Sequence, residues 1–152
     1  MEICDAFLRA AIGTWDKISE SRTVGYQLKE ETITDLNILE LKKRLDKKVI
    51  TIPFNKIIEG KNGADWEWWF RDKSRFWIGL RIQAKIIDIK TDSFEHLHYK
   101  KGKKYQSKKL IIEALKSKPP KIPLYALYTQ WTDKTIPVSW TCRTFPKYTD
   151  LY

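Results

Sequence analysis

Two short runs of the sequence carry the residue types that phosphodiester chemistry needs. Asp65 and Glu67 alternate with tryptophans in Gly63–Phe70, and Gln83 and Lys85 alternate in a second apolar run. Residues two apart in a β-strand point to the same face, so each pair shares one face. If the two runs are neighbouring strands, a carboxylate, an amide oxygen and an ammonium group converge at one end of a sheet. Oxygen ligands beside a lysine predict a hard-cation site suited to phosphodiester hydrolysis.

The elements that must position these residues follow from hydrophobic spacing and from turn signals. Predicted helices cover residues 3–18 (ending near Gly13 or just beyond it), Glu30–Leu45 and Tyr105–Lys116, and predicted strands cover Val49–Ile58, Trp66–Phe70, Phe76–Lys85 and Pro123–Gln130. Residues 19–27 and 91–104 are predicted loops, and Arg71–Arg75 is a predicted hairpin loop. After the first helix, the order is helix, strand, strand, strand, helix, strand.

Asp65 and Gln83-Ala84-Lys85, set in this order of elements, resemble the PD-(D/E)xK nuclease superfamily in its Gln-x-Lys variant. Together with the strings EETITD and GADWEWWF, they also resemble a family of small uncharacterised bacterial proteins assigned to that fold. The resemblance covers roughly residues 28–129. It implies an α/β fold with a restriction-endonuclease-like αβββαβ core, in which helices flank a central mixed sheet. An extra N-terminal helix and an aromatic C-terminal extension complete a single domain over residues 1–152.

The resemblance also implies hydrolysis of DNA that depends on Mg²⁺ or Mn²⁺, with RNA as the alternative substrate. Asp65, the amide oxygen of Gln83 and the backbone carbonyl of Ala84 are expected to bind the metal ion. Lys85 is expected to stabilise charge on the phosphate and to hold the attacking water. The implied role is bacterial defence or genome maintenance. The alternative is a non-catalytic nucleic-acid-binding or protein-interaction module on the same fold, because Gln83 lacks the charge of the usual glutamate.

A further acid is expected at the site to replace that charge. Glu31 matches the first-helix glutamate of the superfamily and stands seven residues before Ile38, which places it at the predicted inward-facing edge of the helix. Glu30 is the adjacent alternative, and Glu59 and Glu67 are reserve ligands. Either first-turn glutamate has a simpler interpretation, since an acid there favourably complements the helix dipole.

The tryptophans of these strands are expected in the core. Trp66 and Trp68 face away from Asp65, so packing beneath a helix is their predicted role. An exposed tryptophan would have a second use, because aromatic rings stack on unpaired bases.

The net charge of +10 and the isoelectric point near 9.5 favour a polyanionic partner. Six lysines within one ten-residue window are predicted to contact the phosphate backbone: Lys100, Lys101, Lys103, Lys104, Lys108 and Lys109. The alternative is a solvated loop and helix face.

Composition sets the remaining expectations. No apolar run reaches the ~18–20 residues of a membrane span, and the first residues lack the basic segment of a secretory signal. Two cysteines in the whole chain are not a disulfide framework, so a cytoplasmic location is expected. Neither His96 and His98 nor Cys142 has the companions of a zinc site or a nucleophile. Cleavage of both DNA strands would require a homodimer, and an activating protein partner is the other expected association.

Overall fold

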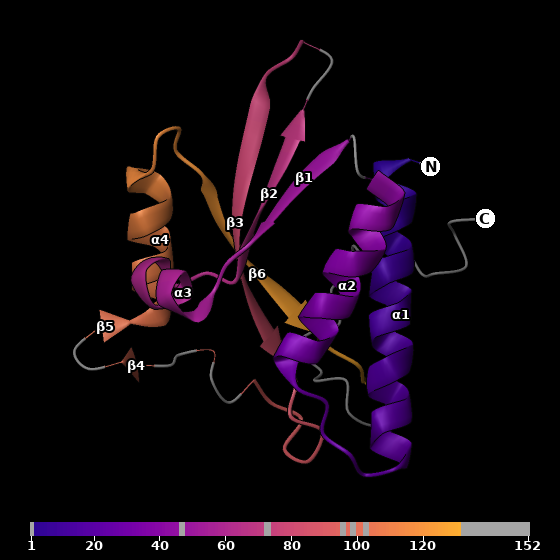
Figure 1. Cartoon of the computed structure of the whole chain (residues 1–152). Helices are drawn as coiled ribbons and strands as arrows, with labels where there is room; N and C mark the ends of the chain where they lie inside the picture. The colour runs from indigo at the N-terminus through magenta and orange to yellow at the C-terminus, as the bar shows by residue number, and fades with distance from the viewer. Residues whose placement is uncertain are drawn as a thin grey trace, which may run out of the picture.

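A computed structural model describes residues 2–45, 48–71, 74–94, 97, 100–101 and 104–131 of the chain. Its helices and strands, in chain order, are α1 (Ile3–Thr23), α2 (Glu30–Leu45), β1 (Val49–Pro53), α3 (Lys56–Asn62), β2 (Trp66–Arg71), β3 (Trp77–Ile86), β4 (Lys100–Lys101), β5 (Lys104–Tyr105), α4 (Gln106–Lys116) and β6 (Ile122–Tyr128). Figure 1 shows the sheet between two helical layers, with α1 and α2 on one side and α3 and α4 on the other. The predicted α/β architecture, a mixed sheet flanked by helices, is confirmed.

The main sheet has the strand order β1-β2-β3-β6. β1, β2 and β3 are antiparallel neighbours, and β6 runs parallel to β3 after the crossover through α4. The register places Trp66 opposite Ile82 and Glu67 opposite Arg81. Asp65, which immediately precedes β2, therefore lies beside Gln83 in the next strand.

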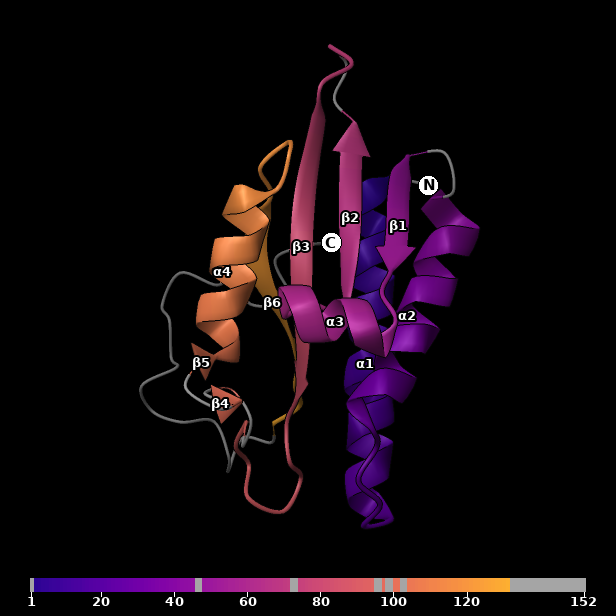
Figure 2. The same cartoon turned by 60° about the vertical axis from the view of Figure 1, so that its left-hand side comes forward.

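The two faces of the sheet differ in character. Trp66, Ile82 and Ala84 point to the face covered by α1 and α2, where they pack with Ile18 and Ile33 in the main core. A second core cluster lies between α1, α2 and β1 and consists of Ala6, Ala10, Leu41, Leu45 and Val49. The opposite face carries the polar residues of β2 and β3, and α3 and α4 cover only part of it (Figure 2).

α1 is longer than the sequence indicated. It continues through Gly13 to Thr23, so the predicted end near Gly13 and the predicted loop from residue 19 are wrong. One glycine inside a helix costs only about 1 kcal/mol. Burial of a row at helical spacing outweighs this cost, and the row consists of Ala6, Ala10, Thr14, Ile18 and Ser21. α2 has the predicted bounds.

The predicted strand over Val49–Ile58 is also wrong beyond Pro53, where β1 ends. Asn55 caps a short helix instead, because its side chain accepts hydrogen bonds from the backbone N–H groups of Ile57 and Ile58. The helix ends at Gly63, whose φ of 74° is left-handed. A Cβ at this position would also meet the backbone of α4, 3.1 Å from the nitrogen of Leu110. Gly63 therefore lets α3 and α4 pack closely just before Asp65.

The remaining expectations concern the second half of the chain. α4 ends at Lys116, just before Lys118-Pro119, as predicted, and β6 corresponds to the strand predicted over Pro123–Gln130. The predicted loop over residues 91–104 includes β4, which pairs with β5 as a small antiparallel ribbon. The aromatic C-terminal extension, His96, His98 and Cys142 lie outside the described residues. None of the helices formed by the described residues is long and apolar enough to span a bilayer.

Candidate active site

Asp65 is held by backbone pairing at the point where β1, β2 and β3 meet. Its N–H donates to the carbonyl of Ile82 (2.8 Å), and its own carbonyl accepts from the N–H of Phe54 (2.8 Å). Its carboxylate oxygen Oδ2 accepts hydrogen bonds from the backbone N–H of Ala84 (2.6 Å) and from Nε2 of Gln83 (2.9 Å). Among the described residues, the other oxygen, Oδ1, has no hydrogen-bond partner. The structure thus places Asp65 against Gln83 and Ala84, but their N–H groups face its carboxylate instead of the predicted amide and carbonyl oxygens.

Gln83 turns its amide the opposite way from what metal binding requires. Its NH₂ group faces Asp65, while Oε1 accepts a hydrogen bond from Nε2 of Gln106 in the first turn of α4 (2.5 Å). The amide oxygen would have to rotate away from Gln106 to become a ligand. Gln106 was not singled out in the sequence, where a glutamine in a lysine-rich segment carries no distinguishing signal.

Lys85 lies on the same face of β3 as Gln83, and its side chain is buried. Its ammonium group is 3.5 Å from Oε1 of Glu30, whose second oxygen accepts from the backbone N–H of Ile86 (3.3 Å). Thr34 helps to fix this end of α2, since its hydroxyl bonds to the carbonyl of Glu30 and to the hydroxyl of Tyr128. The acid that contacts the lysine is therefore Glu30.

Glu31 lies at the rim of the pocket and is exposed, so it is not a buried acid of the site. Its side chain is 63% exposed and forms an ion pair with Nζ of Lys56 (2.5 Å), which also pairs with Glu59 (3.1 Å). Seven residues bring an α-helix round to within about 20° of the same direction, so Glu31 keeps the side of Ile38. In the first turn, however, that side faces the pocket and Lys56 instead of the core.

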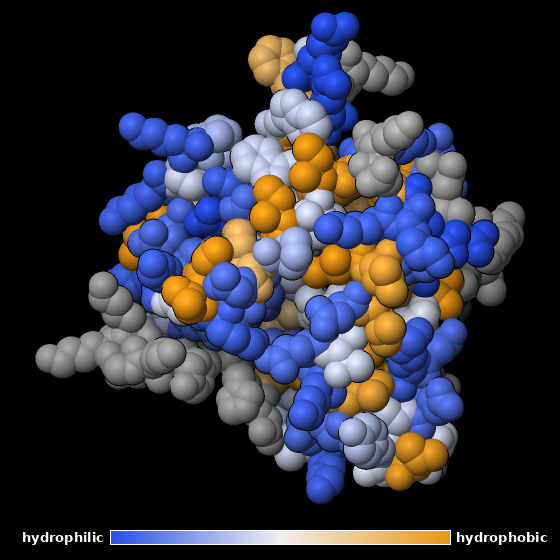
Figure 3. Space-filling model, viewed as in Figure 1, coloured by the Kyte–Doolittle hydropathy of each residue, from blue (hydrophilic) through white to orange (hydrophobic). Residues whose placement is uncertain are grey.

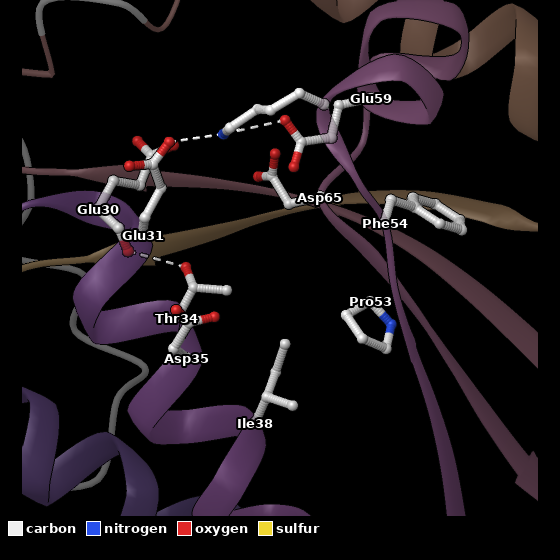
Figure 4. A pocket seen from close by; sticks show the side chains of 10 residues that line it. Glu30, Glu31, Thr34, Asp35, Ile38, Pro53, Phe54, Glu59 and Asp65 are labelled. Atoms are coloured by element: carbon white, nitrogen blue, oxygen red, sulfur yellow. Dashed lines mark hydrogen bonds and ion pairs between the residues drawn. The ribbon is translucent and has the colours of Figure 1, made fainter.

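A pocket of about 90 Å³ opens between the N-terminal turns of α2 and α3, above Asp65 (Figure 4). Its acidic lining consists of Glu30, Glu31, Asp35, Glu59 and Asp65. Figure 4 shows Glu30, Glu31, Glu59 and Asp65 directed toward one another across this opening. Lys56 also lines the pocket, and its ammonium group forms ion pairs with Glu31 and Glu59.

The pKa values reflect this crowding of carboxylates. Burial, and secondarily the charges of Glu30 and Glu59, raise the pKa of Asp65 to about 6, against an opposing hydrogen bond from Ala84. Burial also raises the pKa of Glu30, although Lys85 opposes the shift. The hydrogen bond from Lys56 lowers the pKa of Glu31 and raises that of Lys56 itself. The raised pKa values show that Asp65 and Glu30, both partly buried, favour a proton or another cation.

Glu67, a predicted reserve ligand, is committed to a structural ion pair. Its oxygen Oε1 accepts from Nε and Nη2 of Arg81 (2.9 and 2.6 Å) and lies 3.7 Å from Nζ of Lys121. Its second oxygen accepts from the indole N–H of Trp69 (3.1 Å). Glu59, the other reserve ligand, does line the pocket.

The described members of the predicted phosphate-binding lysines are distributed over three elements, β4, β5 and α4. Lys100, Lys101 and Lys104 belong to β4 and β5, and Lys103 lies outside the described residues. Lys108 is exposed on α4, whereas Lys109 donates to the carbonyl of Gly60 in α3. Lys109 therefore links α4 to α3. A role of these lysines in nucleic-acid binding stays a prediction.

The donor set is compatible with a mostly hydrated magnesium ion. Mg²⁺ commonly keeps several waters and is bound through one or two carboxylates, and Asp65 offers an oxygen without a hydrogen-bond partner among the described residues. Glu30 and Glu59 line the same pocket. In the described part of the chain, no three His, Cys, Asp or Glu side chains are grouped so that they could hold a metal ion.

Comparison with protein families identifies one relationship. The chain belongs to a family of unknown function, DUF6615, whose sequence model matches residues 3–149. No curated protein sequence matches the chain.

Proposed function

We propose that the protein is a metal-dependent nuclease that hydrolyses phosphodiester bonds of DNA in the acidic pocket. The observation that carries this proposal is the position of Asp65. Its carboxylate is anchored through one oxygen by Ala84 and Gln83, and it faces a pocket lined by further acids. Burial and like charges raise its pKa to about 6. A divalent cation would relieve this repulsion, and phosphodiester hydrolysis is a common use of such a cation.

Metal binding, charge stabilisation and positioning fall to different residues in and around the pocket. Asp65 would hold Mg²⁺ or Mn²⁺ together with Glu30 or Glu59, and the bound ion would make a water molecule more acidic. Lys85, 3.5 Å from Glu30, supplies a positive charge next to this acid. Displacement of Glu30 toward the metal would leave the ammonium group available to a phosphate oxygen. Gln106 fixes the amide of Gln83, which in turn orients Asp65.

Nuclease assays with the purified full chain test this proposal. Supercoiled plasmid, linear duplex and single-stranded DNA are incubated with Mg²⁺ or Mn²⁺, and EDTA should abolish any nicking or degradation. The matched variant is Asp65→Asn, which removes the anchored charge and keeps the size of the side chain. Metal-dependent cleavage that persists in this variant at the wild-type rate would exclude the acidic pocket as the active site.

A second candidate function has its own observation. The amide oxygen of Gln83 is held by Gln106, so the group that replaces the usual glutamate is turned away from the pocket. This favours a non-catalytic nucleic-acid-binding module on the same fold. Calorimetric titration with Mn²⁺ separates the two candidates, because a binding module needs no metal site. Binding of Mn²⁺ that is lost in Asp65→Asn supports the nuclease, and DNA binding without any Mn²⁺ binding supports the module.

A further inference from the structure

Among the described residues, no helix covers the outer half of the β1-β2-β3 sheet on the face that carries Asp65. Figure 2 shows these strands extending past α3 without a described helix in front of them. Cross-strand neighbours Ile50, Trp69 and Gly79 form one row there, and Arg71 and Trp77 form the next. We call Ile50, Trp69, Arg71, Trp77 and Lys121 the aromatic face. Ile50 is 46% exposed and Trp77 is 43% exposed. Figure 3 shows apolar side chains between the two helical layers, where the sheet is open.

Trp69 is held in a defined orientation on this face. Its indole N–H donates to Glu67, and its ring lies across Gly79, where an added Cβ would be only 3.0 Å from two ring carbons. The ammonium group of Lys121 lies 5.2 Å from the centroid of the same ring. A partly exposed ring that is fixed at its edge loses little conformational freedom on binding, which favours stacking.

Cations accompany the second ring as well. The guanidinium of Arg71 lies 5.7 Å from the centroid of Trp77, and Arg75 is exposed next to it in the hairpin. The chain as a whole carries a net charge of +10. Aromatic rings combined with basic side chains are the usual composition of surfaces that bind single-stranded nucleic acid, because the rings stack on bases and the cations meet phosphates. Bases within a duplex do not present their flat faces to such a surface.

The aromatic face and the acidic pocket share one strand. Asp65, Trp69 and Arg71 point to the same side of β2, and four residues separate Asp65 from Trp69. At ~3.3 Å per residue this is about 13 Å, a distance that a short stretch of extended nucleic acid can span.

We propose that the aromatic face binds single-stranded nucleic acid by base stacking on Trp77 and Trp69, and so delivers an unpaired strand to the acidic pocket. The delivery step rests on the proposed nuclease function, whereas the binding step does not.

Binding is therefore measured in EDTA, where no cleavage is required. Fluorescence anisotropy follows the full chain binding to labelled oligo(dT), oligo(U) and a hairpin duplex, each of about 16 nucleotides, the upper end of a typical site. Trp77→Ala should weaken binding to both single strands about 10-fold, in line with the loss of one stacked base, and should change duplex binding less than about twofold. Trp77→Phe should restore most of the affinity, because it keeps a ring. If Trp77→Ala weakens binding to oligo(dT) but not to oligo(U), the proposed ligand is single-stranded DNA alone.

Ile78→Ala is the matched control, because Ile78 is the next residue of β3, is also exposed and points to the opposite face of the sheet. It should leave all affinities unchanged. Equal affinity of wild type and Trp77→Ala for the single strands would overturn the proposal, as would an equal loss on the duplex.

Sedimentation of the free protein adds a further test. A wild-type dimer that Trp77→Ala converts to monomer, with DNA binding intact, would assign the face to a second copy of the chain. Single-strand binding that depends on Trp77 in a protein that never cleaves DNA would refute the nuclease function alone.

Discussion

Asp65 and Glu67 lie two residues apart on the same face of the sheet, yet their carboxylates have different surroundings. Glu67 is buried with donors at both oxygens, from Arg81, Trp69 and the nearby Lys121. Asp65 has donors at one oxygen, and its nearest charged neighbours include the acids Glu30 and Glu59. Arg81 is itself tied to α4 through the carbonyl of Glu113. One acid completes a closed ion pair, and the other borders a pocket.

The carboxylate of Glu67 is therefore a structural charge, whereas that of Asp65 is available for binding. Glu67 is buried and Asp65 is partly buried, so the difference in burial is one of degree. What distinguishes them is whether the protein itself satisfies the carboxylate, since a buried charge that is only partly paired is costly. The free energy that this costs at Asp65 is what a metal ion can recover on binding.

The largest expected effect tests the catalytic role proposed for Lys85. Lys85→Ala should lower the rate of metal-dependent DNA cleavage by ~10²–10⁴, the usual scale for a positioned group that assists proton transfer. Glu30 would then lack its cation, but its raised pKa lets it take up a proton instead, so the fold should be retained. Single-turnover rates and circular dichroism of the same preparation give both results. Wild-type rates in the variant would remove Lys85 from the mechanism.

The second prediction compares the two carboxylates by stability. Glu67→Gln leaves Arg81 buried without its charge partner, which typically costs about 3–5 kcal/mol. Asp65→Asn should cost less than about 1 kcal/mol near pH 7.5, because it also removes repulsion from Glu30 and Glu59. Urea unfolding of the two isosteric variants measures the difference. Equal losses would show that the two acids play the same structural role.

A third prediction is the pH dependence that Asp65 contributes. Its pKa rises from an ordinary 3.8 to about 6 on folding, so the folded state holds this proton more tightly than the unfolded state. Stability should therefore fall as pH increases from about 4 to about 6, by at most about 3 kcal/mol from this residue. The raised pKa of Glu30 acts in the same direction. Unfolding free energies across this range should flatten in Asp65→Asn. A wild-type profile with the same slope as the variant would contradict the assignment.

The smallest expected effect distinguishes the two adjacent glutamates of α2. Glu30→Gln should reduce cleavage about 10-fold, because it removes a pocket acid that also contacts Lys85. Glu31→Gln should change the rate less than about twofold, since that side chain is exposed and pairs with Lys56, and such surface pairs contribute little. Cleavage rates at saturating Mg²⁺ suffice for the test. The reverse order of effects would restore Glu31 as the acid of the site.

Much of the fold was predictable, because alternation in strands and capping signals are local. The bounds of α2, the β2 and β3 hairpin and the end of α4 before Lys118-Pro119 all followed from such signals. The prediction was wrong where a tertiary contact or a short motif outweighed the general pattern. Packing carries α1 through Gly13, and Asn55 starts α3 where apolar residues suggested a longer strand.

The candidate site was predictable in its strand residues and less so in its helical ones. Period-two alternation places Asp65 and Gln83 on one face of the sheet, and the short hairpin between β2 and β3 sets the register that brings them together. The choice between Glu30 and Glu31 depends on tertiary partners, because Glu30 meets Lys85 of β3 whereas Glu31 meets Lys56 of α3. The direction of the Gln83 amide depends on Gln106, 23 residues away, and no local pattern encodes that contact.

The contact between Glu30 and Lys85 can form only in the folded chain. The two residues are 55 positions apart and belong to different layers, so they meet only after α2 has docked on the sheet. A nascent or partly opened chain would have the acid and the ammonium group separated, and hydrolysis would be restricted to the completed fold. The amide of Ile86, which donates to Glu30, offers a native reporter, since its hydrogen exchange should accelerate together with loss of activity whenever α2 detaches.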